Sequence, residues 1–151
     1  MPRQVLTDQV LARPPVRAWL GLLRGYRSLT NQLSARLLAD HGLTQNDYEV
    51  LAQLSRAPDG RLRRIDLAER LMLTPSGITR LLDGLERAGL VEKATCDSDA
   101  RVTYAVLTEP GYEKLAAASR THIADIEAAL GCLHAEELRT LGELPGRLAS
   151  D

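Results

Sequence analysis

The sequence predicts a mostly α-helical chain that carries one small β-hairpin. Over most of the 151 residues, apolar side chains recur at steps of three and four, which is the pattern of one buried helix face. Further along, the extended runs LVEKAT and VTYAVLT are separated by the polar stretch CDSDAR, which predicts a hairpin with a polar tip. Apolar residues make up 44% of the chain, which is enough to bury a core in one domain with helical extensions.

The first part of the chain predicts a tail followed by a long helix. Residues 1–15 are expected to form a flexible tail or a short helix that ends at Pro14 and Pro15. A long helix is predicted from Val16, because apolar residues then follow one helix face. Gly42 ends this helix, since glycine readily adopts the left-handed conformation of a C-terminal cap.

Two shorter helices are predicted next. Thr44 caps the first, which runs through TQNDYEVLAQLSRA. The turn PDGR separates it from a second helix, RRIDLAERL, whose inward residues are expected to be Ile65, Ala68 and Leu71. A tight corner, MLT, then leads into the following helix.

The stretch LTPSGITRLLDGLERAGLV predicts a helix with clear start and stop signals. Thr74 is its expected N-cap, Pro75 occupies the first helical position, and Gly89 ends it. Its predicted buried stripe consists of Ile78, Leu81, Leu82 and Leu85. After the hairpin, Thr108 caps another long helix, and LHAEELRTLGELPGRL forms the last one.

This order of elements predicts a winged helix-turn-helix domain over residues 44–108. Residues 16–43 and 109–151 are predicted to form a helical dimerisation region. Their helices have more apolar surface than one small domain would cover, and such surplus faces usually pair with a second copy of the chain. The predicted fold class is therefore mostly α with a small β-hairpin wing, flanked by long N- and C-terminal dimerisation helices.

The start of the TPSGITR helix carries the groups that a DNA-reading helix needs. In helix-turn-helix domains the second helix enters the major groove by its N-terminal end. That end here offers short polar groups, a glycine that allows close approach, backbone amides for a phosphate, and one long donor. The candidate residues are Thr74, Ser76, Gly77, Thr79 and Arg80.

Further residues extend this candidate DNA-binding surface. Arg101 at the hairpin tip is placed to enter the neighbouring minor groove, and Asp97 or Asp99 is placed to brace the loop. Arg63 and Arg64 are candidate phosphate contacts. The net charge of −1 does not by itself suggest a nucleic-acid partner, but residues 102–151 hold eight of the twenty acidic side chains and leave the rest mildly basic.

Each candidate also has a structural interpretation that needs no DNA. The threonines and the serine can act only as helix caps. Arg80 can pair with Asp83 or Asp66, the hairpin arginine can pair with Asp99, and the remaining arginines can be solvated. The joint occurrence of these residues in this order favours DNA binding, whereas a single arginine says little.

Three stretches of the sequence resemble the MarR family of winged-helix regulators. They are HGLTQNDYEVLAQL, DLAERLMLTPSGITRLLDGLERAGLVEK and DSDARVTYAVLTEPG, and the resemblance extends from about Val16 to Leu148. The last stretch holds the Asp-x-Arg signature of the wing at Asp99 and Arg101. The wing of the family often reads Asp-Arg-Arg, so Ala100 leaves this tip with one basic group fewer.

The resemblance implies a homodimer, built from the first and the last two helices, that binds a pseudo-palindromic operator in double-stranded DNA. It implies a repressor that a small phenolic or other lipophilic effector releases from DNA. The effector site of similar proteins lies between the dimer helices and the winged domain. Trp19, Tyr26 and Tyr48 are the candidates for it here, although aromatic residues at helical spacing are usually part of the core.

A cysteine-based redox switch is an alternative way of regulation. Cys96 lies at the wing, where oxidation could disturb DNA contact, but Asp97 and Asp99 are expected to raise the pKa of its thiol. Cys132 is expected to be buried between the last two helices. The two cysteines are far apart and predict neither a disulfide framework nor a metal site.

The remaining function classes find little support in the sequence. No catalytic motif, cofactor loop or metal-ligand spacing occurs, which argues against an enzyme. No apolar run is long enough for a membrane span and the start is too polar for a signal peptide, so a cytoplasmic protein is expected. A winged-helix module that binds protein instead of DNA, and a DNA-binding protein without an effector, stay open.

Overall fold

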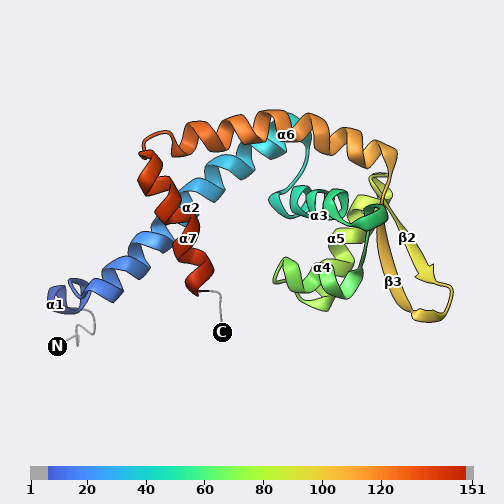
Figure 1. The fold of residues 1–151 in the computed structure, drawn as a ribbon, viewed down its shortest axis with the longest axis horizontal. Coiled ribbons are helices and arrows are strands. Elements are labelled where there is room, and N and C mark those ends of the chain that lie inside the picture. The colour runs from blue at the N-terminus through green and yellow to red at the C-terminus, as the bar shows by residue number, and fades with distance from the viewer. Residues whose placement is uncertain (1–6, 149–151) are drawn as a thin grey trace, which may run out of the picture.

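The computed structural model describes residues 7–148 and shows long helices joined to a smaller mixed domain (Figure 1). Helices α2 and α6 pack against each other, and α6 continues over the domain, where α3 also packs against it. In chain order the elements are α1 (Asp8–Leu11), α2 (Pro14–His41), α3 (Gln45–Arg56), the 3-10 helix η1 (Pro58–Gly60), β1 (Arg61–Arg63), α4 (Arg64–Arg70), α5 (Pro75–Arg87), β2 (Val91–Cys96), β3 (Asp99–Leu107), α6 (Glu109–Leu130) and α7 (Ala135–Leu148). The structure confirms the predicted mostly helical winged fold.

Local capping signals explain where several helices begin. Thr44 forms a capping box with Asp47, and its hydroxyl accepts a hydrogen bond from the Asp47 amide. Thr74 and Thr108 cap α5 and α6, each accepting from the backbone amide three residues later. Gly42 follows α2 with φ 65°, the left-handed conformation expected for it.

The expected tail is partly helical. Residues 8–11 form α1, and Pro14 and Pro15 belong to the first turn of α2 instead of ending the tail. Proline is favoured there because it lacks a backbone N–H, and the N–H groups of a first helical turn have no acceptor within the helix. Residues 1–6 of the expected tail and residues 149–151 of the expected dimerisation region lie outside the described residues.

The sheet has three antiparallel strands in the order β1-β3-β2, whereas the sequence predicted only a hairpin. Strand β1 pairs Leu62 with Ala105 of β3, and β2 pairs Lys93 with the same residue on the other side. The three residues of β1 are too few for a visible alternation, and Leu62 is the only one of them that turns inward. The added strand ties the start of α4 to the base of the wing.

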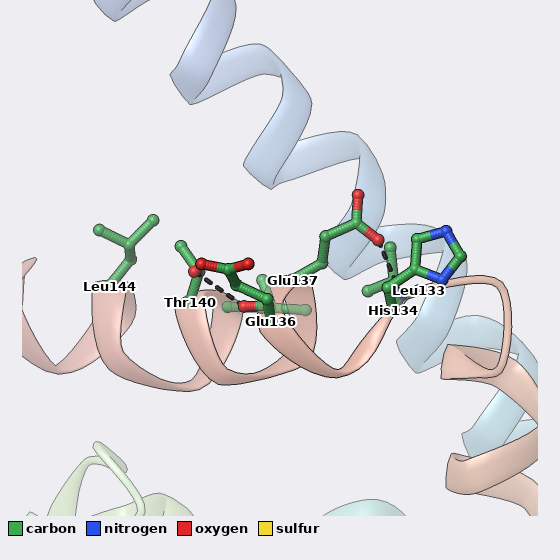
Figure 2. A pocket seen from close by; sticks show the side chains of 7 residues that line it. Leu133, His134, Glu136, Glu137, Thr140 and Leu144 are labelled. Carbon is green, nitrogen blue, oxygen red and sulfur yellow. Dashed lines mark hydrogen bonds between the residues drawn. The ribbon is translucent and has the colours of Figure 1, made fainter.

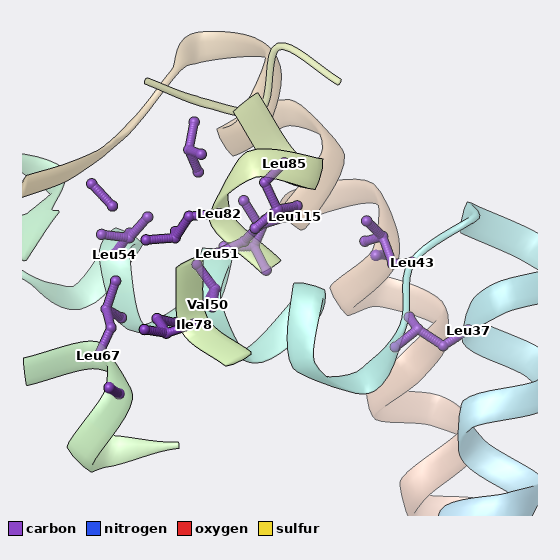
Figure 3. Close-up of a cluster of buried hydrophobic side chains, with 14 residues drawn as sticks. Leu37, Leu43, Val50, Leu51, Leu54, Leu67, Ile78, Leu82, Leu85 and Leu115 are labelled. Atoms are coloured by element: carbon purple, nitrogen blue, oxygen red, sulfur yellow. The ribbon is translucent and has the colours of Figure 1, made fainter. Parts of the chain in front are cut away.

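The core lies between α3, α4, α5, the sheet and the start of α6 (Figure 3). Leu51, Leu54 and Leu67 are fully buried, and Ile78 and Leu82 from α5 pack among them. The buried stripe predicted for α5 is confirmed, with Leu81 only half-buried at its edge. This core fixes α5 and leaves its N-terminal end at the surface.

The inward face of α4 differs from the expected one. Leu67 and Ala68 are buried, while Ile65 is 61% exposed. Ile65 lies two residues before Leu67, which is about 200° around an α-helix, so the two side chains point to opposite sides. The helix has only seven residues, too few for the sequence pattern to fix its inward face.

The start of α6 contacts the backbone of Gly89 and Leu90, which connect α5 to β2. The amide of Thr108 donates to the carbonyl of Leu90 (3.2 Å), and the Thr108 hydroxyl donates to the carbonyl of Gly89 (2.7 Å). A Cβ on Gly111 would lie 2.0 Å from the Leu90 carbonyl oxygen, so only glycine fits there. The start of α6 is therefore closely packed against the winged domain.

Large apolar side chains remain exposed along the long helices. They are Trp19, Leu20, Leu22, Tyr26 and Leu38 on α2, Tyr112 and Ile123 on α6, and Leu138, Leu141, Leu144 and Leu148 on α7. Among residues 7–148 no helix combines the length and apolarity that crossing a lipid bilayer requires. These faces are amphipathic surfaces that the single chain leaves uncovered.

Candidate nucleic-acid interface

The turn between α4 and α5 is tight and leaves the first turn of α5 exposed at the surface. Met72 adopts φ 52°, a left-handed conformation that is uncommon outside glycine, and its side chain is exposed. The amide of Leu73 donates to the carbonyl of Ala68 (2.8 Å), which closes the turn. The N-terminal end of α5 is thereby presented at the surface of the domain.

The first turn of α5 is organised around the Thr74 cap. The Thr74 hydroxyl accepts from the Gly77 amide (3.1 Å) and lies 3.2 Å from the hydroxyl of Ser76. A Cβ on Gly77 would come within 3.1 Å of the Thr74 hydroxyl oxygen and crowd the cap. The expected role of Thr74 as a helix cap is thus confirmed. Because Gly77 has no side chain, it leaves room for the Thr74 hydroxyl and keeps the helix end narrow.

Arg64 reaches from α4 to α5. Its guanidinium donates to the Thr79 hydroxyl (2.8 Å), and that hydroxyl donates to the carbonyl of Pro75 (2.8 Å). Together with Ser76 and Arg80, these residues line one shallow surface depression. The structure therefore places most of the predicted α5 candidates around one basic hollow.

Arg80 makes none of the ion pairs that the structural interpretation required. Its two candidate partners are taken, because Asp83 pairs with Lys93 of β2 and Asp66 pairs with Arg63. In the part of the chain that the structure describes, no ion pair or hydrogen bond involves the Arg80 side chain. The guanidinium is consequently available to a ligand outside the protein.

Arg63 is engaged within the protein. It donates twice to the Asp66 carboxylate, at 2.9 and 2.8 Å, and this pairing raises the pKa of the Arg63 guanidinium. The bidentate geometry fixes the plane of the guanidinium. A DNA phosphate would have to share Arg63 with Asp66, which makes it a weaker candidate than Arg64 or Arg80.

The wing tip holds Arg101 almost free in solvent. Its side chain is 96% exposed and its guanidinium lies 3.9 Å from the Asp99 carboxylate, at the outer limit of an ion pair. The Asp99 carboxylate accepts from the Arg101 amide (3.0 Å), so it braces the turn as predicted. Arg101, Arg63 and Arg64 line a second depression, between the start of α4 and the first residues of β3 next to the wing tip.

The two depressions share Arg64 and form one surface, which we call the basic strip. It comprises Arg63, Arg64, Arg80 and Arg101. The strip runs from the free end of α5 to the wing. A surface of this kind combines a narrow helix end with long cationic donors, which suits the grooves and phosphates of a nucleic acid.

The three aromatic candidates do not meet in the single chain. Trp19 and Tyr26 are 60% and 64% exposed on α2. Tyr26 lines an apolar pocket of about 550 Å³ between α2, α6 and α7. Tyr48 lies on α3, where its hydroxyl is 3.1 Å from the Ser119 hydroxyl and its ring meets His122 edge-on, with 4.7 Å between the centroids.

His122 is a buried polar residue that the sequence did not single out. It is 3% exposed, and its Nδ1 has no hydrogen-bond partner within the described residues. Burial is the main cause that lowers the pKa of its imidazole. His122 and Tyr48 lie where α3 of the domain meets α6.

Another pocket lies at the start of α7 and is acidic (Figure 2). The backbone amide of His134 donates to the Glu137 carboxylate (2.7 Å), and the Thr140 hydroxyl donates to the Glu136 carbonyl (2.9 Å). Leu133, Leu141 and Leu144 supply its apolar lining. Its carboxylates would repel phosphates, so it does not belong to a nucleic-acid interface.

Both expectations about the cysteines need correction. A hydrogen bond with Ser98 lowers the pKa of the Cys96 thiol, and this outweighs the opposite influence of Asp97. Cys132 is exposed at the end of α6 instead of buried. Sequence proximity to carboxylates misled the prediction for Cys96, because the Ser98 hydroxyl lies 3.1 Å from the sulfur and its hydrogen bond is the largest influence on the pKa of the thiol.

Two contacts of the wing base were missed from the sequence. The Arg61 guanidinium lies over the Tyr104 ring, 4.2 Å from its centroid, and Lys93 bridges Asp83 and Glu86 of α5. The three-residue spacing of Asp83 and Glu86 was a signal for a cation nearby. The sequence could not show which cation would reach them across the fold.

Comparison with known proteins identifies the wider group. A family model described as MarR family matches residues 41–102. AbsC, a MarR family transcriptional regulator from Streptomyces coelicolor, is 35% identical, with 95% of this chain and 94% of that chain covered and a TM-score of 0.83. Sco3205, a MarR family regulator from the same organism solved in complex with DNA, is 29% identical, with 95% and 88% covered and a TM-score of 0.85. The HTH-type transcriptional repressor YetL of Bacillus subtilis is 32% identical over 79% of this chain and 74% of its own length.

Proposed function

This chain belongs to the MarR family of transcriptional regulators, and on that premise we propose that it is a homodimeric repressor of a pseudo-palindromic DNA operator. The observation that carries the proposal is the basic strip beside the free end of α5. Arg80 has no partner among the described residues there, and Arg101 extends into solvent from the wing. The related regulator Sco3205 was solved in complex with DNA, which supports the same kind of ligand for this chain.

In the proposed complex the first turn of α5 enters the major groove. Arg80 reads a base edge or holds a phosphate, and Ser76 and the backbone amides of the turn hold the DNA backbone. Arg64 is the main phosphate contact of the strip, because Thr79 already orients it. Arg101 enters the minor groove next to the recognition site.

The exposed apolar faces support the dimer. Two recognition helices must face successive major grooves about 34 Å apart, which a symmetric pair of chains can achieve. Helices α2 and α7 hold most of the uncovered leucines and lie apart from the basic strip. A second copy placed on these faces would leave both strips open to DNA.

The junction between α3 and α6 supports release by a small effector. Tyr48 and His122 form a mixed aromatic and polar contact there, and His122 has a buried nitrogen without a partner among residues 7–148. A phenolic hydroxyl could donate to that nitrogen. Such a ligand would have to part α3 from α6, which would move the recognition helix.

Operator binding tests the proposal directly. The purified protein is titrated against the DNA upstream of its own gene, with salt and competitor DNA varied. Arg80→Ala is expected to cost about 1–3 kcal/mol and to relax specificity if the residue reads a base, and Arg101→Ala should lower the salt slope by about one unit if it meets the backbone. Arg56→Ala, whose guanidinium bonds the Ala52 carbonyl of its own helix, is the matched control.

Other outcomes of the same experiment would support other functions. Binding that is absent even at low salt would favour a winged-helix module that docks on protein. DNA binding that no phenolic or lipophilic compound alters would indicate a regulator without an effector. Loss of binding on mild oxidation, prevented by Cys96→Ser, would indicate a redox sensor.

A further inference from the structure

The wing and the recognition helix are connected by a three-membered charge cluster. The ammonium of Lys93 on β2 pairs with the Asp83 carboxylate and lies 3.1 Å from the Glu86 carboxylate, both on α5. The Asp83 contact is the main cause that raises the pKa of Lys93, and the same contact lowers the pKa of Asp83. All three side chains are partly exposed to solvent.

This cluster lies next to Arg80. Asp83 follows Arg80 by three residues, and residues three apart on a helix are neighbours on its surface. Asp83 is therefore within reach of three cations, Arg80 and Arg87 on its own helix and Lys93 on the wing. In the structure the wing lysine pairs with it, and Arg80 is left without a partner among the described residues.

The cluster contributes little to folding stability. Ion pairs between exposed side chains gain modest Coulomb energy, lose side-chain entropy and are screened by salt. Its larger consequence is that the Asp83 carboxylate pairs with Lys93 and not with Arg80. If Lys93 were absent, Asp83 would be free to pair with Arg80, and Glu86 would lose its contact with the wing ammonium.

We propose that Lys93 is a positioning residue for DNA recognition, which occupies Asp83 and Glu86 and so keeps Arg80 free for the operator. The inference rests on the proposed DNA-binding function. Lys93 acts through Arg80 and does not itself need to touch DNA. The same contact holds β2 against α5, so the wing and the recognition helix meet DNA in a fixed relation.

The decisive experiment is a rescue. Lys93→Met keeps most of the apolar stem and removes the charge, and we expect operator affinity to fall about tenfold, the lower range for losing one base contact. Asp83→Asn in the same chain removes the competing carboxylate and should restore affinity to within about threefold of the wild type. Lys114→Met, the other lysine of the chain, is the control and should leave binding unchanged.

A cycle with Arg80→Ala sharpens the test. If Lys93 acts through Arg80, removing Arg80 should cost much less affinity in the Lys93→Met background than in the wild type. Equal costs in the two backgrounds would overturn the inference. A salt slope that falls by about one unit, without rescue by Asp83→Asn, would show instead that Lys93 contacts a phosphate itself.

A measurement without DNA separates this inference from the proposed function. The NMR signal of the Arg80 side-chain Nε–H should shift in Lys93→Met and return in the variant that also carries Asp83→Asn. An unchanged signal would overturn the inference even if the wild type binds DNA, for example because Arg87 has replaced the lysine. A wild type that binds no DNA would overturn the proposed function and leave this signal as the test of the cluster.

Discussion

The winged domain and the long helices differ in how far they bury their apolar faces. Both are built from amphipathic segments, but Leu51 and Leu54 of the domain are fully buried, whereas Leu22 of α2 and Leu144 of α7 remain 41% and 46% exposed. The domain closes its core within one chain. The helical region leaves a stripe of apolar side chains only partly covered by the described part of the chain, although its sequence pattern is equally regular.

The difference shows what an apolar pattern means. Periodicity indicates which face of a helix avoids water, because that depends on local spacing. Periodicity does not indicate whether the surface that packs on this face belongs to the same chain or to another one. Three substitutions test whether the two regions differ in this way.

The largest effect is expected in the closed core. Leu82→Ala removes a side chain that is 1% exposed and should cost about 2–5 kcal/mol of unfolding free energy, through lost burial and the cavity left behind. Urea denaturation followed by circular dichroism measures it. Ile65→Ala, an exposed apolar residue of the same domain, should change stability by no more than about 0.5 kcal/mol. Similar losses in both variants would contradict the assignment of the core.

A smaller effect is expected on the open face. Leu141→Ala on α7 should weaken self-association by about 10- to 100-fold, since burying a leucine is worth about 1.5–3 kcal/mol. Sedimentation equilibrium measures the dissociation constant, and Ile65→Ala again serves as control because it lies outside the long helices. If Leu141→Ala leaves association unchanged, α7 does not form the dimer.

The smallest effect concerns the junction of the two regions. The folded state lowers the pKa of His122 below its ordinary value of 6.5, mainly through burial, with His41 acting in the same direction and Asp125 against it. The unfolded chain therefore binds the proton more readily, so stability is complete above about pH 6.5 and falls as the pH drops below it.

One proton limits this slope to about 1.4 kcal/mol per pH unit. Urea midpoints between pH 7.5 and 5 measure it, and His122→Gln should flatten the profile. His134→Gln, on an exposed side chain, is the matched variant and should keep the slope. A wild-type profile that is flat over this range would contradict the lowered pKa of His122.

Features that depend on nearby residues were predictable from the sequence. Thr44, Thr74 and Thr108 cap the helices that they were expected to cap, because a cap needs only its own following turn. The basic strip contains all four arginines expected on the DNA-binding surface. Their roles on DNA stay predictions.

Features that depend on partners distant in sequence were not predictable. Strand β1 exists because β3 lies beside it, and its three residues carry no signal of their own. Asp83 is neutralised by a lysine on the wing, and no local rule chooses that lysine over Arg80. The exposure of Tyr26 likewise depends on what α6 and α7 leave open.

The contact between α6 and the Leu90 backbone makes the long helix a lever arm. With 22 residues at 1.5 Å each, α6 is about 33 Å long, which is close to the distance between two operator half-sites. A tilt of about 5° at one end moves the other end by about 3 Å. Because a Cβ at Gly111 would clash with the Leu90 carbonyl, α6 and the domain move together, and in the proposed dimer a small change where the two chains meet would displace α5 from the proposed DNA groove.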